Sequence, residues 1–122
     1  MAKDKPCADA IALWSADICR REEMPGEGRA RVFTVDGRRI AVFRVEGLFY
    51  AVDDFCSHAQ SSLAEDGHRC GLFVECGLHR ARFSLESGKV MRGPTRKNLR
   101  SYDLAIGSMV TATERDALPA GR

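Results

Sequence analysis

Residues 56–79 read CSHAQSSLAEDGHRCGLFVECGLH and contain two short groups of side chains of the kinds that bind metals. The first group has the spacing C-x-H, with Cys56 and His58, and the second has the spacing C-x-x-H, with Cys76 and His79. These four residues are two of the five cysteines and two of the three histidines in the chain. Thiolate sulfur and imidazole nitrogen are ligands for zinc and iron. The spacing therefore predicts one metal site formed by two loops.

The ligand types alone do not choose between zinc and iron. A set of two cysteines and two histidines suits tetrahedral zinc as well as it suits a binuclear iron–sulfur centre. Each group supplies one cysteine and one histidine in the same order, so two facing loops could give one iron both cysteines and the other iron both histidines. Zinc fingers more often have both cysteines first and both histidines second. On the residues alone, a binuclear centre, a structural zinc site and an accidental grouping all stay open.

The chain as a whole has the size and composition of one globular domain. Its 122 residues are 44% hydrophobic and 30% charged, with a formal net charge of +2 at pH 7. Such a chain can bury a core but has no room for a separate substrate domain. The balance is not that of a disordered tail, and it does not indicate a general nucleic-acid-binding protein.

The amino-terminal residues 1–23 contain no apolar run of signal-peptide or membrane-spanning length, because Asp9 and Asp17 interrupt it. Five cysteines without an export signal fit metal ligation or burial better than a disulfide framework. We therefore expect a cytoplasmic protein that does not contact membranes.

Short apolar runs separated by turn residues fill the middle of the chain. Residues 30–52 contain three such runs, with Asp36-Gly37 and Glu46-Gly47 between them, and this pattern predicts a three-stranded meander. A strand over residues 72–74 would lead into the second ligand group.

Two more hairpins are expected, over residues 80–91 and 100–113, and residues 21–28 are expected to form a turn or a single helical turn. Many short strands without a long segment of helical period predict an all-β fold, either an antiparallel sandwich or a small barrel.

The ligand pattern also resembles that of a known family. C-x-H, seventeen intervening residues and C-x-x-H is similar to the Rieske [2Fe-2S] signature. The likeness extends over residues 38–67 and 76–94, which look like the soluble Rieske ferredoxins that supply electrons to bacterial aromatic-ring-hydroxylating dioxygenases. The resemblance implies an all-β Rieske-type sandwich or small barrel with a cluster-binding subdomain of two loops.

The same resemblance implies how the chain is divided. Residues 1–122 would be a single Rieske domain. Its cluster-binding part would cover about residues 53–97, and its base sheets about residues 12–52 and 98–113.

For the site, the resemblance implies that Cys56 and Cys76 bind one iron of a single [2Fe-2S] cluster, while His58 and His79 bind the other. The backbone amides expected to donate hydrogen bonds to the cluster sulfurs are those of Gln60, Leu78, Arg80 and Ala81. Pro94 would lie in a loop that covers the cluster.

The chain departs from the respiratory branch of the family, which has an additional cysteine in each cluster loop and pairs the two in a disulfide. Here those positions are Ser61 and Leu78. Rieske centres span about −150 to +300 mV, and the missing disulfide favours the lower end of this range.

The rest of the sequence indicates a carrier and not an enzyme. Outside the ligand groups only His68 remains, so the two histidines of a mononuclear 2-His-1-carboxylate iron site are lacking. Gly26 and Gly28 are followed by Arg31 where a dinucleotide-binding loop would have its third glycine. The expected partners are a flavoprotein ferredoxin reductase and a terminal Rieske oxygenase, with no direct small-molecule substrate, and we expect a monomer.

Two other functions stay open at this point. One is a small Rieske subunit of a larger reductase, of the nitrite-reductase type, and the other is a structural zinc domain with two cysteine and two histidine ligands. Many subunits of the first kind lack the ligands, whereas all four are present here, which favours the carrier.

Several residues near the ligand groups are expected to have structural roles. Cys7, Cys19 and Cys70 are interpreted as buried or partly exposed structural cysteines, and His68 as a surface imidazole. Residues 80–100 carry seven cations and the single acid Glu86. These cations indicate either a solvated hairpin or a surface that steers an acidic partner.

Overall fold

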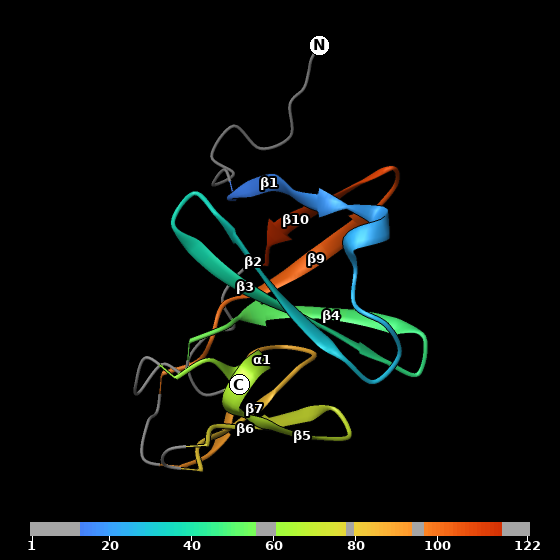
Figure 1. The fold of residues 1–122 in the computed structure, drawn as a ribbon. Helices are drawn as coiled ribbons and strands as arrows, with labels where there is room; N and C mark the ends of the chain where they lie inside the picture. Colours follow the sequence, from blue (N-terminus) through green and yellow to red (C-terminus); the bar gives the residue numbers. More distant parts are fainter. Residues whose placement is uncertain (1–12, 56–60, 78–79, 94–96, 116–122) are drawn as a thin grey trace.

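The computed structural model describes residues 13–55, 61–77, 80–93 and 97–115 (Figure 1). Two antiparallel sheets dominate these residues, as the all-β prediction requires. The larger sheet has six strands in the order β1-β10-β9-β4-β3-β2 and curls into a nearly closed barrel. Its strands are β1 (Ser15–Arg20), β2 (Ala30–Val35), β3 (Arg38–Val45), β4 (Leu48–Asp53), β9 (Ser101–Ile106) and β10 (Met109–Glu114).

The smaller sheet has four strands in the order β5-β6-β7-β8. Its strands are β5 (His68–Cys70), β6 (Phe73–Glu75), β7 (Arg82–Ser84) and β8 (Val90–Arg92). Two short helices complete the described residues, the 3-10 helix η2 (Arg21–Glu23) and α1 (Leu63–Asp66). Figure 1 shows α1 and the smaller sheet together at the end of the molecule away from β1. None of the helices in the described part of the chain has the length and apolar character needed to cross a membrane.

The predicted meander is confirmed as β2, β3 and β4. Its two turns have two residues each, since Val35 pairs with Arg38 and Val45 pairs with Leu48. All four turn residues adopt positive φ, with values of 53° at Asp36 and 76° at its following glycine, and 52° and 80° in the second turn. Two successive positive φ values match the twist of a tight hairpin, which explains the aspartate–glycine and glutamate–glycine pairs in the sequence.

The hairpins predicted over residues 80–91 and 100–113 are also confirmed, as β7–β8 and β9–β10. The β5 strand was not expected, because residues 65–70 look like a turn in the sequence. Instead, His68–Cys70 pairs with Phe73–Glu75 through a tight turn in which Gly71 has φ of 62°. The single helical turn considered for residues 21–28 is present as η2.

Strand β3 links the two sheets through its side chains. Ile40 and Val42 point into a buried cluster inside the larger sheet, whereas Ala41 and Phe43 belong to a second cluster shared with the smaller sheet. All four are at most 3% exposed. Alternating side chains of a strand point to opposite faces, so the apolar run 40–43 is buried on both faces of β3.

The shared cluster lies between the larger sheet, α1 and the smaller sheet. Phe83 on β7 and Val74 on β6 are fully buried there, together with Leu63 of α1. Leu99, which precedes β9, belongs to the same cluster. The smaller sheet is therefore packed against the larger one by a common core.

Candidate metal centre

The first predicted ligand group follows β4 and precedes α1. Its members Cys56 and His58 lie outside the described residues, as does Gln60. Both ends of the segment are described, and Phe55 pairs with Ser62 in an isolated antiparallel bridge. This bridge places the residues before and after the first predicted ligand group side by side.

A buried carboxylate lies beside this bridge. Asp54 is 0% exposed, and its Oδ1 accepts hydrogen bonds from the Ser62 hydroxyl and the Ala64 amide, both at 2.9 Å. Its Oδ2 accepts from Arg39 Nη2 at 2.9 Å and from Arg39 Nε at 3.2 Å. A charged group buried to this extent is tolerated only when it is paired and hydrogen-bonded, as this one is.

The helix α1 begins at the same point. The Ser62 side chain caps it by accepting a hydrogen bond from the Glu65 amide at 3.1 Å, and the Ser62 hydroxyl also donates to Asp54. One serine therefore both starts the helix and ties it to the carboxylate that precedes the ligand loop.

The second predicted ligand group starts at Cys76, which follows β6 directly and is 0% exposed. The Cys76 amide donates to the Ala81 carbonyl at 2.7 Å, and the Arg80 amide donates to the Cys76 carbonyl at 3.1 Å. Arg80 has φ of 58°, the left-handed conformation in which the chain can turn back sharply. Leu78 and His79 lie outside the described residues. The two hydrogen bonds close a short loop that begins at a buried sulfur.

The bases of the two loops adjoin. A Cβ on Gly77 would lie 2.6 Å from the carbonyl oxygen of Asp66, the last residue of α1, so only glycine fits there. Leu63 at the start of α1 belongs to the same buried cluster as Cys76 and Ala81. The structure therefore places α1, which follows the first predicted ligand group, directly against the residue after Cys76.

A third segment lies against the second loop. A Cβ on Gly93 would lie 2.5 Å from the Cα atom and 2.9 Å from the Cβ atom of Ala81, and Gly93 has φ of 122°. Both the close approach and the backbone conformation require glycine here. Pro94, predicted to lie in a covering loop, is outside the described residues, but the glycine before it lies at the base of the second ligand loop.

The described part of the site fits a sulfur-ligated metal. Cys76 places its sulfur in a dry, apolar cluster, and a thiolate in such a place is stabilised when a metal cation binds it. Within the described ranges, no three histidine, cysteine, aspartate or glutamate side chains gather as a metal site. Since Cys56, His58 and His79 lie outside those ranges, the complete ligand set stays a prediction.

The nearby residues interpreted as structural are mostly described. His68 is exposed on β5, and Cys70 on the same strand is also exposed. Cys19 is buried, its thiol donates to the Met24 sulfur at 3.6 Å, and burial raises the pKa of that thiol. Cys7 lies outside the described residues. Cys19 and Cys70 thus differ in exposure.

Positive charge gathers at the same end of the molecule. Arg82 on β7 is the register partner of Arg92 on β8, and exposed Arg80 precedes β7 by two residues. We call these three arginines the basic edge. Within it, Arg82 Nη2 bonds Glu75 Oε2 at 3.3 Å. Arg96, one of the seven predicted cations, lies outside the described residues.

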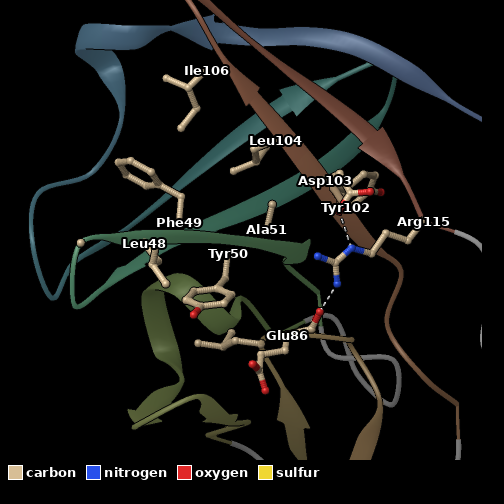
Figure 2. A pocket seen from close by; sticks show the side chains of 12 residues that line it. Leu48, Phe49, Tyr50, Ala51, Glu86, Tyr102, Asp103, Leu104, Ile106 and Arg115 are labelled. Carbon is tan, nitrogen blue, oxygen red and sulfur yellow. Dashed lines mark hydrogen bonds and ion pairs between the residues drawn. The ribbon is translucent and has the colours of Figure 1, made fainter.

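A groove of about 570 Å³ lies elsewhere on the surface, between β4, β9 and the turn after β7 (Figure 2). Its lining includes Phe49, Leu104 and Ile106, and Arg115 spans one side by donating to Asp103 Oδ1 at 2.7 Å and to the Glu86 carbonyl. Among the described residues, the lining of the groove includes none of those at the bases of the two predicted ligand loops.

The sequence did not single out two residues of the site, Asp54 and Arg39. The available signal is a pair of adjacent charged doublets, Arg38-Arg39 at the start of β3 and Asp53-Asp54 at the end of β4. In an antiparallel pair these ends are neighbours, so opposite charges at the two places indicate ion pairs.

Known proteins are similar to this chain in sequence and in fold. The Rieske [2Fe-2S] domain profile matches residues 15–103. The biphenyl dioxygenase ferredoxin subunit of Pseudomonas sp. strain KKS102 is 38% identical over 88 residues, which are 72% of this chain and 80% of the relative.

Two solved structures show the same fold. The ferredoxin of carbazole 1,9a-dioxygenase from Nocardioides aromaticivorans IC177 superposes with a TM-score of 0.69 and 27% identity, covering 81% of this chain and 95% of that one. A chain in the complex of reduced oxygenase and oxidized ferredoxin in carbazole 1,9a-dioxygenase superposes with a TM-score of 0.71 and 27% identity, covering 86% and 97%.

Proposed function

This chain belongs to the Rieske [2Fe-2S] domain family, and on that basis we propose that it is a one-electron carrier which takes electrons from a reductase and passes them to a terminal ring-hydroxylating oxygenase. The observation that carries the proposal is that the family match includes both loop bases, Phe55–Ser62 and Cys76–Ala81. The similarity to ferredoxin subunits of dioxygenases supports the same role. The protein would be an electron-transfer component and not an enzyme.

In this proposal Cys56 and Cys76 hold one iron of a [2Fe-2S] cluster, and His58 and His79 hold the other. The burial of Cys76 and the adjoining loop bases support this assignment. The cluster would supply reversible one-electron transfer. Two neutral histidines in place of two thiolates remove two negative charges from the donor set, which makes reduction easier than in an all-cysteine cluster.

The described residues would exclude water and fix the ligand loops. Leu63 and Ala81 would help to keep water from Cys76, since all three are buried in one apolar cluster. The Arg80 amide, expected to donate to a cluster sulfur, donates to the Cys76 carbonyl and so closes the loop. That the amides of Gln60, Leu78 and Ala81 donate hydrogen bonds to the cluster sulfurs stays a prediction.

A shuttle is proposed over an oxygenase because the chain lacks the residues for a substrate iron. After the four ligands are assigned, His68 is the one histidine left in the sequence, and it is exposed on β5. A 2-His-1-carboxylate site needs two. An electron that enters this protein must therefore leave it for another protein.

The proposed partners are a flavoprotein ferredoxin reductase and the Rieske centre of an oxygenase. One related structure is a complex of oxygenase and ferredoxin, which supports the second partner. The basic edge lies at the end of the molecule that carries the ligand loops, so it would favour an acidic surface on one partner.

The cytoplasm is the proposed location. Cys19 and Cys70, both in the described part of the chain, are present as free thiols, and free thiols suit a reducing compartment.

The decisive test is made on the purified full chain. We expect a red-brown protein with two irons and two acid-labile sulfides per chain, a rhombic electron paramagnetic resonance signal on reduction, and a midpoint below about +100 mV. We also expect it to stimulate product formation by a dioxygenase reductase–oxygenase pair. A colourless folded protein containing zinc would exclude the carrier, and a midpoint above about +100 mV would favour the respiratory branch instead.

A further inference from the structure

Asp54 stands at the junction of the larger sheet and the first ligand loop, and all its polar groups are used there. Its carboxylate is fully buried and binds the Ser62 hydroxyl, the Ala64 amide and the Arg39 guanidinium. Its backbone amide donates to the Arg39 carbonyl at 2.8 Å, and its carbonyl accepts from the Leu63 amide at 2.8 Å. This one residue therefore joins β3 to the start of α1.

The contacts of Asp54 join the described residues that precede and follow the first predicted ligand group. Asp54 precedes the Phe55–Ser62 bridge on one side, and its carboxylate reaches Ser62 and Ala64 on the other. Arg39 also stacks over the Phe55 ring, with its guanidinium carbon 4.7 Å from the ring centroid. The described residues on the two sides of this segment, Asp54-Phe55 and Ser62, are thereby tied to β3 and to each other.

We propose that Asp54 is a positioning residue for the metal centre, acting through the first ligand loop and without touching the metal. The inference rests on the proposed ligands Cys56 and His58, because these follow Asp54 by two and four residues. Side chains that orient metal ligands change metal affinity by about 10–100-fold when removed. Removing the carboxylate also leaves the Arg39 guanidinium, whose side chain is 32% exposed, without its ion-pair partner.

Asp54→Asn is the sharpest variant, since it keeps the shape of the side chain. The side-chain oxygen of the asparagine can still accept hydrogen bonds from Ser62 and Ala64. Its NH2 group then faces the Arg39 guanidinium, and since both groups are donors, no hydrogen bond forms between them. The side-chain ion pair between Asp54 and Arg39 is lost, while the backbone hydrogen bond from the Asp54 amide to the Arg39 carbonyl is kept. The unpaired positive charge of Arg39 would also favour the reduced state of a nearby centre.

The matched control is Asp53→Asn, which removes the same charge one residue earlier. Asp53 binds Arg100 and Tyr102 instead, and those residues belong to the returning chain and to β9. Ser62→Ala is the milder second variant, because it removes one of the bonds to Asp54 and keeps the carboxylate. Each full-length protein is compared with wild type for iron and sulfide content, rate of cluster loss to an iron chelator, resonance g-values and midpoint potential.

We expect Asp54→Asn to lose its cluster at least about ten-fold faster than wild type, with shifted g-values and a more positive midpoint. Ser62→Ala should change in the same direction by less, and Asp53→Asn should keep the wild-type g-values. Wild-type g-values, midpoint and chelation rate in folded Asp54→Asn would overturn the inference, as would equal changes in Asp53→Asn. If Asp54→Asn does not fold, Ser62→Ala decides by the same readouts. A wild type without iron would overturn the proposed function as well.

Discussion

The consecutive carboxylates of Asp53 and Asp54 bind opposite sides of the junction between the two sheets. Asp53 Oδ2 accepts from Arg100 Nε at 2.8 Å and from the Arg100 amide at 3.2 Å, where the chain returns to the larger sheet. Asp54 Oδ1 accepts from the Ser62 hydroxyl at 2.9 Å, where the chain leaves it. The side chains of adjacent residues in an extended chain point in opposite directions. Asp53 can therefore bind Arg100 while Asp54 binds Ser62.

Asp53→Ala should destabilise the whole molecule. The change leaves the Tyr102 hydroxyl without its acceptor at 2.8 Å and removes the ion pair with Arg100. A loss of about 1–3 kcal/mol in the free energy of unfolding is expected, measured by urea denaturation. Asp103→Ala is the control, because its pair with Arg115 is solvent-exposed and should contribute less than about 1 kcal/mol. Equal losses in the two variants would contradict this ranking.

Phe83→Ala should be among the most destabilising single changes. Its ring is fully buried in the cluster shared by the two sheets, so truncation leaves a cavity there. We expect a loss of about 3–5 kcal/mol in the free energy of unfolding. Phe73→Ala on the neighbouring strand β6 is the matched control, since Phe73 is 38% exposed and should lose about 1 kcal/mol. A small loss in Phe83→Ala would show that the shared core does not hold the two sheets together.

Stability should fall in alkaline solution because of Tyr102. Burial raises the pKa of Tyr102 to about 12, above the usual value of about 10. Between these two values the unfolded chain releases the tyrosine proton and the folded one keeps it. The contribution of the protonated Tyr102 hydroxyl to the free energy of unfolding is therefore complete below about pH 10, and it is lost as the pH rises from about 10 to about 12.

The check is denaturation of wild type and Tyr102→Phe across that interval. Phenylalanine has no proton to lose, so the stability difference between the two proteins should shift in favour of the variant with rising pH. Parallel curves for the two proteins would show that Tyr102 does not produce the alkaline loss.

Cys76→Ser should prevent cluster binding, whereas Cys70→Ser should not. Cys76 is the buried sulfur of the second loop, and Cys70 is exposed on β5. We expect near-complete loss of iron, sulfide and visible absorbance in the first variant and wild-type values in the second. Iron content and absorbance spectra check this directly, and the reverse pattern would show that the ligand assignment is wrong.

Reversing charge at the basic edge should slow electron transfer to an acidic partner. The double change Arg80→Glu and Arg92→Glu alters two exposed positions beside the second ligand loop. We expect about a ten-fold slower rate of oxygenase reduction at low ionic strength, and a much smaller difference at 1 M salt, where charges are screened within about 3 Å. Stopped-flow mixing measures the rate of oxygenase reduction at the two ionic strengths.

The double change Arg20→Glu and Arg21→Glu is the control, because it alters the net charge by the same amount at two exposed positions, at the end of β1 and the start of η2. If this control slows the reaction as much as the double change, the effect belongs to overall charge and not to the basic edge.

The parts of the fold with local signals could be predicted from sequence. The meander was readable because its turns have the residues that positive φ requires, such as Asp36-Gly37. The ligand groups could be proposed because their spacing is short and their residue types are rare, and their role as ligands stays a prediction. In both cases the information lies within a few adjacent residues.

The parts that depend on distant partners could not be predicted in this way. Asp54 looks like an ordinary surface acid, and its burial follows from pairing with Arg39, fifteen residues earlier and on another strand. Strand β5 was missed for a similar reason, because His68–Cys70 has no apolar pattern of its own and is extended only through its pairing with β6.

The two faces of β3 have a mechanical consequence. Because Ile40 and Val42 are locked into one core while Ala41 and Phe43 are locked into the other, neither half can rotate without disrupting a close-packed interior. The described strands should therefore tumble in solution with a single rotational correlation time. A partner protein that binds either sheet would therefore fix the orientation of both sheets, including the smaller sheet beside the predicted ligand loops.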